Sequence, residues 1–197
     1  MADYWNHNTA YHPRIIRAAS QRDVLDVGCG EGLLLERLVP FARTVTGIDP
    51  DQASIQRAAA RLKGSDNTRL VSGDFITTDF SGAEFDLICF VASLHHMDSR
   101  KALEKAKSLL RPGGRIIVIG IAASSTIADI TVDVLRTPVV RLSGLFHRET
   151  QDVGVPVRDA IESLTVVRGI AADVLPGSRI ERGLYYRYLL EWTKPLG

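Results

Sequence analysis

The sequence has few cysteines and almost no net charge. Its 197 residues include two cysteines, Cys29 and Cys89, too few for the disulfide framework of a small secreted protein. We therefore expect two reduced thiols in a cytoplasmic protein. Lysine and arginine total 24 against 23 aspartate and glutamate residues, which gives a net charge of +1. Without a strong field of one sign, we expect neither a nucleic acid partner nor binding to an anionic membrane.

The sequence also lacks a long hydrophobic run. Its most apolar stretch, IIVIGIAASSTIA (116–128), ends at Asp129 and is too short and too rich in hydroxyl groups to span a bilayer. The opening MADYWNHNTAYHPR has no apolar centre, so it does not resemble a secretory signal. With 45% hydrophobic and 24% charged residues, the composition is that of an ordinary globular protein, and the length fits one domain.

Between about Val24 and Gly120, short apolar runs alternate with segments of helical periodicity. This alternation predicts a mostly parallel sheet covered by helices on both faces. The expected strands are 24–27, 44–49, 68–74, 85–93 and 115–120, and the expected helices are 32–41, 51–62 and 99–110. Asp51 and Ser99 stand where helix N-caps are expected, and Pro112-Gly113-Gly114 is expected to separate the last helix from its strand.

The alternation stops after Gly120. We predict that residues 121–163 form an inserted helical lid, because a structureless loop of that length is unusual in a compact domain. A helix over 165–175 and two strands within 179–193 are expected to complete the chain. The single domain would then comprise an N-terminal segment (1–22), a core (23–120), the lid (121–163) and a C-terminal helix and strand pair (164–197).

The stretch DVGCGEG (26–32) follows the first expected strand. A glycine-rich turn between strand and helix is a usual place for a nucleotide in such a sheet. The dinucleotide fingerprint G-x-G-x-x-G would require glycine at position 33, where this chain has Leu33. Asp26 and Glu31 would also repel a pyrophosphate and attract a cation. S-adenosylmethionine, which carries an ammonium and a sulfonium but no phosphate, therefore fits this turn better than NAD.

Two further acids follow the next strands. Asp49 ends the strand 44–49, about 20 residues beyond the glycines, where a carboxylate can hold both ribose hydroxyls. In SGDF (72–75), Asp74 could accept a hydrogen bond from the adenine amino group while Phe75 closes over the ring. A helix cap at Asp49 and a simple turn at SGDF are the structural alternatives.

The pieces VLDVGCGEG, VTGIDPD, SGDF, FDLICFVASLHHM and LLRPGGRIIVIG, in this order and spacing, resemble the class I S-adenosylmethionine-dependent methyltransferases, in particular their small bacterial members. The resemblance implies a Rossmann-like α/β sheet of seven strands, with the last strand antiparallel. It also implies a set of cofactor contacts: Asp26, Gly28, Cys29 and Gly30 at the methionine end, Asp49 at the ribose, Pro50, Asp74 and Phe75 at the adenine, and the carbonyl of Val91 at the ammonium.

The opening DYWNHNTAYHP resembles the N-terminal strap of these enzymes, which folds over the cofactor. The resemblance implies that several of its side chains lie partly buried near the site, namely Tyr4, Trp5, His7, Asn8, Tyr11 and His12, and that Tyr11 contacts the cofactor. An ordinary amphipathic helix packed on the sheet is the alternative.

Methyl transfer from a sulfonium requires alignment and exclusion of water, and a hydroxyl or protonated amine acceptor also requires a base. His95 and His96, just beyond the fourth strand, are the expected base, with capping and packing as their alternative roles. We expect no metal, because adjacent histidines on an extended segment diverge. In the lid, His147 is a second candidate base. Arg136, Arg141 and Arg148 suggest either a solvated surface or a pocket for a lipophilic or anionic molecule.

Taken together, these features predict a methyltransferase that acts on an oxygen or nitrogen atom of a small-molecule acceptor, as a monomer or a homodimer. A non-catalytic domain that binds S-adenosylmethionine is one alternative. The others are an enzyme that uses this cofactor for aminopropyl or carboxyl transfer, and an NAD-dependent oxidoreductase.

Overall fold

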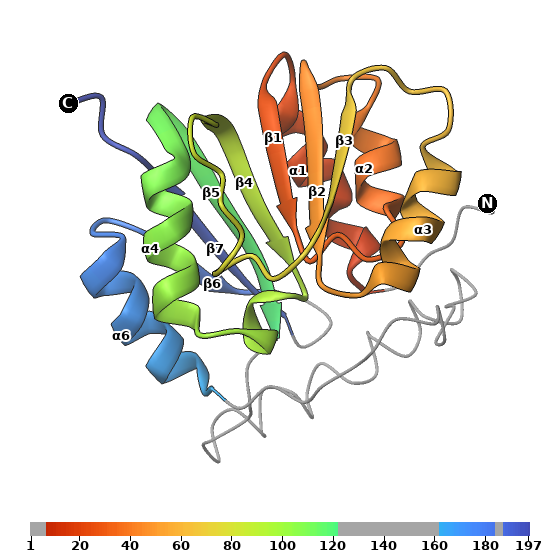
Figure 1. Cartoon of the computed structure of the whole chain (residues 1–197). Helices are drawn as coiled ribbons and strands as arrows, with labels where there is room; N and C mark the ends of the chain where they lie inside the picture. The colour runs from red at the N-terminus through yellow and green to blue at the C-terminus, as the bar shows by residue number, and fades with distance from the viewer. Residues whose placement is uncertain (1–6, 122–161, 184–186) are drawn as a thin grey trace.

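A seven-stranded sheet runs through the part of the chain that the computed structural model describes, residues 7–121, 162–183 and 187–197 (Figure 1). Its strands are β1 (Asp23–Val27), β2 (Thr44–Asp49), β3 (Thr68–Ser72), β4 (Phe85–Val91), β5 (Leu110–Ile121), β6 (Arg179–Arg182) and β7 (Arg187–Thr193), in the spatial order β3-β2-β1-β4-β5-β7-β6. Strands β1 to β5 pair in parallel, and β7 is antiparallel to both β5 and β6. The expected Rossmann-like sheet with an antiparallel last strand is confirmed.

Helices cover both faces of this sheet (Figure 1). They are α1 (His12–Ala19), α2 (Leu33–Leu38), α3 (Gln52–Arg61), α4 (Ser99–Leu109) and α6 (Leu164–Val174), with short 3₁₀ turns η1 (Thr9–Tyr11) and η2 (Leu94–His96). Consecutive residues of a strand serve opposite faces: Val24 and Leu87 pack with residues of α1 and α2, whereas Leu25 and Ile88 pack with residues of α4 and α6. This explains why the central strands are apolar without alternation.

The predicted N-cap of α4 and the predicted start of β5 differ from the structure. The N-cap of α4 is Asp98, whose carboxylate accepts a hydrogen bond from Lys101 N at 3.0 Å. Ser99, the expected cap, instead donates its hydroxyl to Glu162 at 2.5 Å. In addition, β5 begins at Leu110 rather than after Gly114, since Leu110 already pairs with Phe85 of β4. Asp51, by contrast, caps α3 as expected, through hydrogen bonds from the backbone of Ala53 and Ser54.

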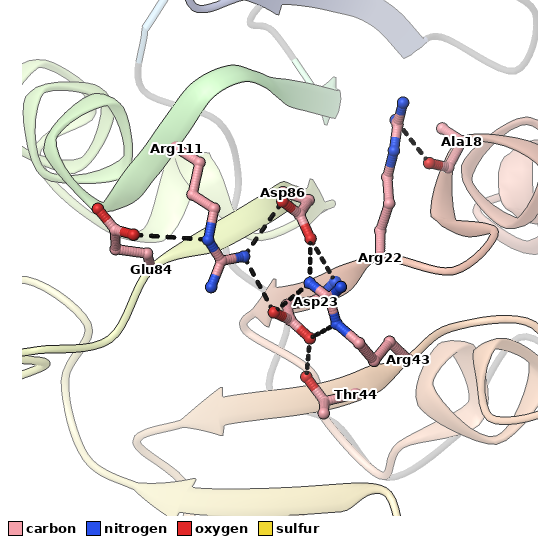
Figure 2. A network of polar contacts seen from close by, with 8 residues as sticks. All are labelled: Ala18, Arg22, Asp23, Arg43, Thr44, Glu84, Asp86 and Arg111. Carbon is pink, nitrogen blue, oxygen red and sulfur yellow. Dashed lines mark hydrogen bonds and ion pairs between the residues drawn. The ribbon is translucent and has the colours of Figure 1, made fainter.

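A network of charged side chains holds the amino ends of the strands together (Figure 2). The carboxylate of Asp23 accepts hydrogen bonds from Arg43 at 2.6 and 2.8 Å and from Arg111 at 2.9 Å. Asp86 pairs with the same two arginines at 2.9 and 3.1 Å. Hydrogen bonding from Arg43, above all, holds the pKa of Asp23 well below its usual range. Because its acids are paired with arginines, this network joins the amino ends of β1, β4 and β5 to the start of β2.

The predicted lid lies almost entirely outside the described residues. His147 and the three arginines Arg136, Arg141 and Arg148 are therefore not described. Tyr4 and Trp5 of the N-terminal segment also lie outside the described residues. Within the described ranges, no helix has the length and hydropathy needed to cross a membrane.

Candidate functional site

The candidate site lies at the opposite edge of the sheet, where the parallel strands β1, β2 and β4 end. β1 lies between β2 and β4, so the segments that follow these strands are neighbours, and the arrowheads of β1 and β4 point to this edge in Figure 1. Ligands of open α/β sheets bind outside the carboxyl ends of the strands. Most residues expected from the sequence lie on these segments.

The turn Gly28–Gly32, here called the elbow, reverses the chain between β1 and α2. Its three glycines have φ values of +74°, +53° and +80°, a left-handed backbone conformation that residues with a side chain rarely adopt. A Cβ atom at Gly28 would lie 2.4 Å from the Cβ of Ser93, and one at Gly32 would lie 3.0 Å from the Cβ of Ala58 in α3. Gly32 therefore allows the start of α2 to pack closely on α3.

Asp49 connects the elbow to the end of β2. Its side chain is buried, with Oδ2 accepting a hydrogen bond from Gly30 N and Oδ1 accepting one from Asp51 N, both at 2.9 Å. Each carboxylate oxygen has a second lone pair that can accept from a ligand hydroxyl. The neighbouring Pro50 is exposed beside it. Asp49 is therefore both a support of the elbow and a candidate ligand contact.

Asp26 is a fully buried acid beneath the elbow. The thiol of Cys89 donates to its carboxylate at 3.5 Å. Burial, above all, raises its pKa to about 7; the Cys89 hydrogen bond opposes this shift and the nearby Asp49 adds to it. Burial also raises the pKa of the Cys29 thiol, so both cysteines are protonated at neutral pH. Neither Asp26 nor Asp49 pairs with a basic side chain of the described residues, so a cation bound here would stabilise the ionised form of Asp26.

Glu31 differs from these two acids because it has an arginine partner. Its carboxylate accepts a hydrogen bond from Arg61 at 3.0 Å, and Arg61 also donates to the Glu31 carbonyl at 3.2 Å. The arginine comes from α3 and is shared with the carboxylate of Glu36, so the expected attraction of Glu31 for a cation stays a prediction. Asp26 and Asp49, in β1 and β2, have no such arginine partner among the described residues.

The turn after β3 offers a donor and an acceptor side by side. Asp74 is exposed, and its Oδ1 accepts hydrogen bonds from Ile76 N and Thr77 N at 2.8 and 3.1 Å. Among the described residues, no group donates to its Oδ2 and no group accepts from the N–H of Phe75. A carboxylate oxygen and an N–H group are therefore available at this turn.

The ring of Phe75 lies elsewhere than expected. It is 3% exposed and packs edge-on against Phe90, with the ring centroids 5.8 Å apart. The ammonium of Lys105 lies 5.3 Å from its centroid and donates to the carbonyls of Ile76 and Thr78. The aromatic ring therefore supports the turn from the core and does not close over an adenine.

The segment after β4 carries Val91 and both candidate histidines. Val91 is half-buried at the end of the strand, and Ala92 has a φ of +53°, which is rare for a residue with a side chain. Ser93 fixes this segment to β1 by donating its hydroxyl to the carbonyl of Val27 at 2.5 Å. His95 is half-buried and His96 is exposed.

The two imidazole rings lie 4.0 Å apart between centroids, with an interplanar angle of 38°. The premise that they diverge on an extended segment is wrong, because η2 brings them together. No three His, Cys, Asp or Glu side chains cluster as metal ligands in the parts of the chain that the structure covers.

The described part of the N-terminal segment contacts α2 and the C-terminal strand pair. His7, Asn8 and Tyr11 are half-buried and His12 is buried. The oxygen of Asn8 accepts a hydrogen bond from Arg187 at 2.9 Å, and the Tyr11 hydroxyl lies against Gly183 at the end of β6, where it would be 2.2 Å from an added Cβ. His12 Nδ1 lies 2.9 Å from Arg37 Nη1; since an arginine only donates, this nitrogen accepts. The segment thus joins α2 to the C-terminal strand pair.

Three residues that support the site were not predicted from the sequence: Arg61, Ser93 and Lys105. Arg61 had a usable signal, because it stands three residues after the buried Ala58 and so falls on the buried face of its helix. A basic residue on such a face requires a partner. Ser93 and Lys105 carry no comparable signal, since their partners Val27, Ile76 and Thr78 act through backbone carbonyls.

Comparison with known proteins extends this description. Residues 24–114 match the family described as Methyltransferase domain. An uncharacterized methyltransferase of Mycobacterium tuberculosis is 31% identical over 198 residues, which cover 98% of both chains. A ubiquinone biosynthesis O-methyltransferase of Idiomarina loihiensis is 36% identical over 100 residues, 48% of this chain and 40% of that protein.

The crystal structure of N-methyltransferase NodS from Bradyrhizobium japonicum, in complex with S-adenosyl-L-homocysteine, has a similar fold. Its TM-score is 0.66 at 20% identity, and the match covers 96% of this chain and 89% of NodS. The similarity therefore extends well beyond the glycine turn, over nearly the whole chain.

Proposed function

This chain belongs to the class I S-adenosylmethionine-dependent methyltransferases, and we propose that it methylates an oxygen or nitrogen atom of a small-molecule acceptor. The observation that carries this proposal is the half-buried His95 beside His96 at the end of β4, next to the elbow. An imidazole can accept the proton that a hydroxyl or an ammonium loses on methylation. The names of two relatives, an O-methyltransferase and an N-methyltransferase, agree with either acceptor atom.

The residues at the carboxyl edge fit the cofactor. Asp49 has lone pairs for two ribose hydroxyls, and Asp74 Oδ2 with the Phe75 N–H complements adenine, over the exposed Pro50. Asp26, Gly28, Cys29, Gly30 and the carbonyl of Val91 would border the methionine end, where Asp26 and Asp49 favour its positive charges. When bound, S-adenosylmethionine supplies an electrophilic methyl group on a sulfonium.

The protein's own contribution is then positioning, exclusion of water and removal of a proton. The elbow and the Ser93 segment are tied to β1 and β2 by buried hydrogen bonds, so they hold the site without rearrangement. We assign proton removal to His95, with His96 beside it. Membership of the methyltransferase family argues against an NAD-dependent oxidoreductase. The experiment below distinguishes an enzyme from a domain that binds the cofactor without catalysis.

We expect methylated product when the full chain is incubated with methyl-labelled S-adenosylmethionine and a panel of phenols, carboxylic acids and amines. His95→Ala should lower kcat roughly a hundredfold, the usual effect of losing a general base, and leave the affinity for the cofactor nearly unchanged. His96→Ala serves as the matched control and should have a smaller effect, because that ring is exposed. Cofactor binding without turnover on any acceptor would favour the non-catalytic alternative.

Cofactor binding is expected to strengthen as the pH rises through 7. The pKa of Asp26, raised to about 7 by burial, leaves this carboxyl protonated in the folded protein at pH values where an unfolded chain would ionise it. Its contribution to stability is thus greatest in acid and is lost as the pH rises through 7. An ammonium bound nearby favours the ionised form, so the affinity for S-adenosylhomocysteine should rise roughly fivefold to tenfold from about pH 6 to 7.5.

Titration calorimetry at the lower pH, in two buffers of different ionisation enthalpy, should detect the proton released on binding. Asp26→Asn is expected to bind with the same affinity at both pH values. If that variant keeps the pH dependence of the unaltered protein, Asp26 is not its source.

A further inference from the structure

Arg61 is the most completely buried charged side chain for which ion pairs are seen in the described residues. It is the last residue of α3, and 1% of its side chain is exposed. Its guanidinium is used in three directions: toward the Glu31 carboxylate at 3.0 Å, the Glu31 carbonyl at 3.2 Å and the Glu36 carboxylate at 2.7 Å. Burying a cation is costly unless such partners are present. The arrangement therefore fixes Glu31 in one position.

Glu31 is the fourth of the five residues of the elbow. The residue before it, Gly30, donates its N–H to Asp49, and the residue after it, Gly32, donates to the carbonyl of Cys29. Gly28 and Cys29 are held by the carbonyl of Ile48. Thus the strand β2 holds the first half of the elbow, and among the described residues Arg61 alone makes hydrogen bonds to the second half from an element other than the adjoining α2.

This second attachment has a physical purpose. Glycine loses more conformational entropy on ordering than any other residue, and the elbow contains three of them. An elbow held from one side only would sample other conformations, and a ligand would have to select the correct one at a cost in affinity.

We propose that Arg61 is a positioning residue for the cofactor, acting through Glu31 to order the elbow before binding. The inference rests on the proposed function only in that the elbow holds S-adenosylmethionine, and it is independent of the acceptor. Arg61 itself touches neither the cofactor nor the acceptor in this assignment.

Glu36 supplies a matched control, because it pairs with the same arginine and lies outside the elbow. Its side chain is 41% exposed, against 12% for Glu31. Glu31→Gln and Glu36→Gln each remove one carboxylate partner of Arg61, but only the first alters the elbow. A role in general stability predicts similar effects of the two variants, whereas positioning predicts a difference.

The test measures binding of S-adenosylhomocysteine, together with thermal unfolding and amide hydrogen exchange at Gly30 and Gly32 in the ligand-free protein. Arg61→Gln is expected to bind about tenfold more weakly and to exchange these amides faster. Glu31→Gln should change in the same direction, and Glu36→Gln should stay within about twofold of the unaltered protein. Arg61→Lys, which keeps the charge but not the forked geometry, should be intermediate.

Equal loss of affinity in Glu31→Gln and Glu36→Gln, or unchanged binding and exchange in a folded Arg61→Gln, would overturn the inference. Should Arg61→Gln fail to fold, the Glu31 and Glu36 pair still decides it. Failure of the unaltered protein to bind S-adenosylhomocysteine would contradict the assignment of the cofactor site instead, so the two failures are distinguishable.

Discussion

Gly28→Ala is expected to destabilise the protein by about 2–5 kcal/mol and to abolish measurable cofactor binding. Two effects combine. The backbone at Gly28 has a φ of +74°, and the added Cβ would lie 2.4 Å from that of Ser93, whose hydroxyl is fixed to the carbonyl of Val27. Ser93 cannot move away without losing that bond, so the elbow or β4 must shift.

Gly64→Ala separates these effects. Gly64 has a φ of +90°, but nothing lies within 4 Å of an added Cβ, so this variant should lose only about 1–2 kcal/mol. Urea unfolding gives both values. Adding Ser93→Gly to Gly28→Ala should recover part of the loss, because it removes the atom that clashes. Equal destabilisation by the two alanine variants would show that the contact with Ser93 is unimportant.

Asp49→Ala is expected to weaken binding of S-adenosylmethionine tenfold to a hundredfold, on the order of 1.4–2.8 kcal/mol. The structure gives two reasons for this loss. The carboxylate would no longer hold the ribose hydroxyls, and Gly30 and Asp51 would lose the acceptor for their N–H groups. Titration calorimetry with S-adenosylmethionine measures the first, and unfolding of the ligand-free protein measures the second.

Asp51→Ala is the matched control for this variant. It also removes a carboxylate that accepts backbone hydrogen bonds at the start of α3, and should cost about 1 kcal/mol of stability as the loss of a helix cap. Its affinity for the cofactor should stay within about twofold of the unaltered protein, since Asp51 is assigned no ligand contact. If Asp49→Ala also binds normally, another residue holds the ribose.

The part of the fold that follows from short stretches of sequence was predictable. The strand 44–49 and the Asp51 cap agree with the expectation residue by residue, because apolar periodicity and capping depend on neighbours in the chain. The glycine turn was recognised in the same way, since its spacing alone excludes the dinucleotide fingerprint. Even the antiparallel last strand followed from the resemblance that these stretches carry.

The contents of the site were less predictable where a side chain chooses a partner far away in the sequence. Glu31 and Arg61 are separated by 30 residues, and no residue near Glu31 in the sequence indicates that its carboxylate forms an ion pair with an arginine. The ring of Phe75 could pack against a ligand or in the core. Its contacts with the rings of Phe80 and Phe90 place it in the core. The histidine pair likewise depended on whether its segment was extended or turned.

The sequence by itself determined the order of strands and helices and the position of the elbow, because these depend on periodicity, capping and backbone freedom within a few residues. Only the tertiary structure decided which acids remain unmatched at the site and which ring supports it from the core. Charge pairing and packing depend on distances in space, and folding brings together residues that the chain keeps far apart.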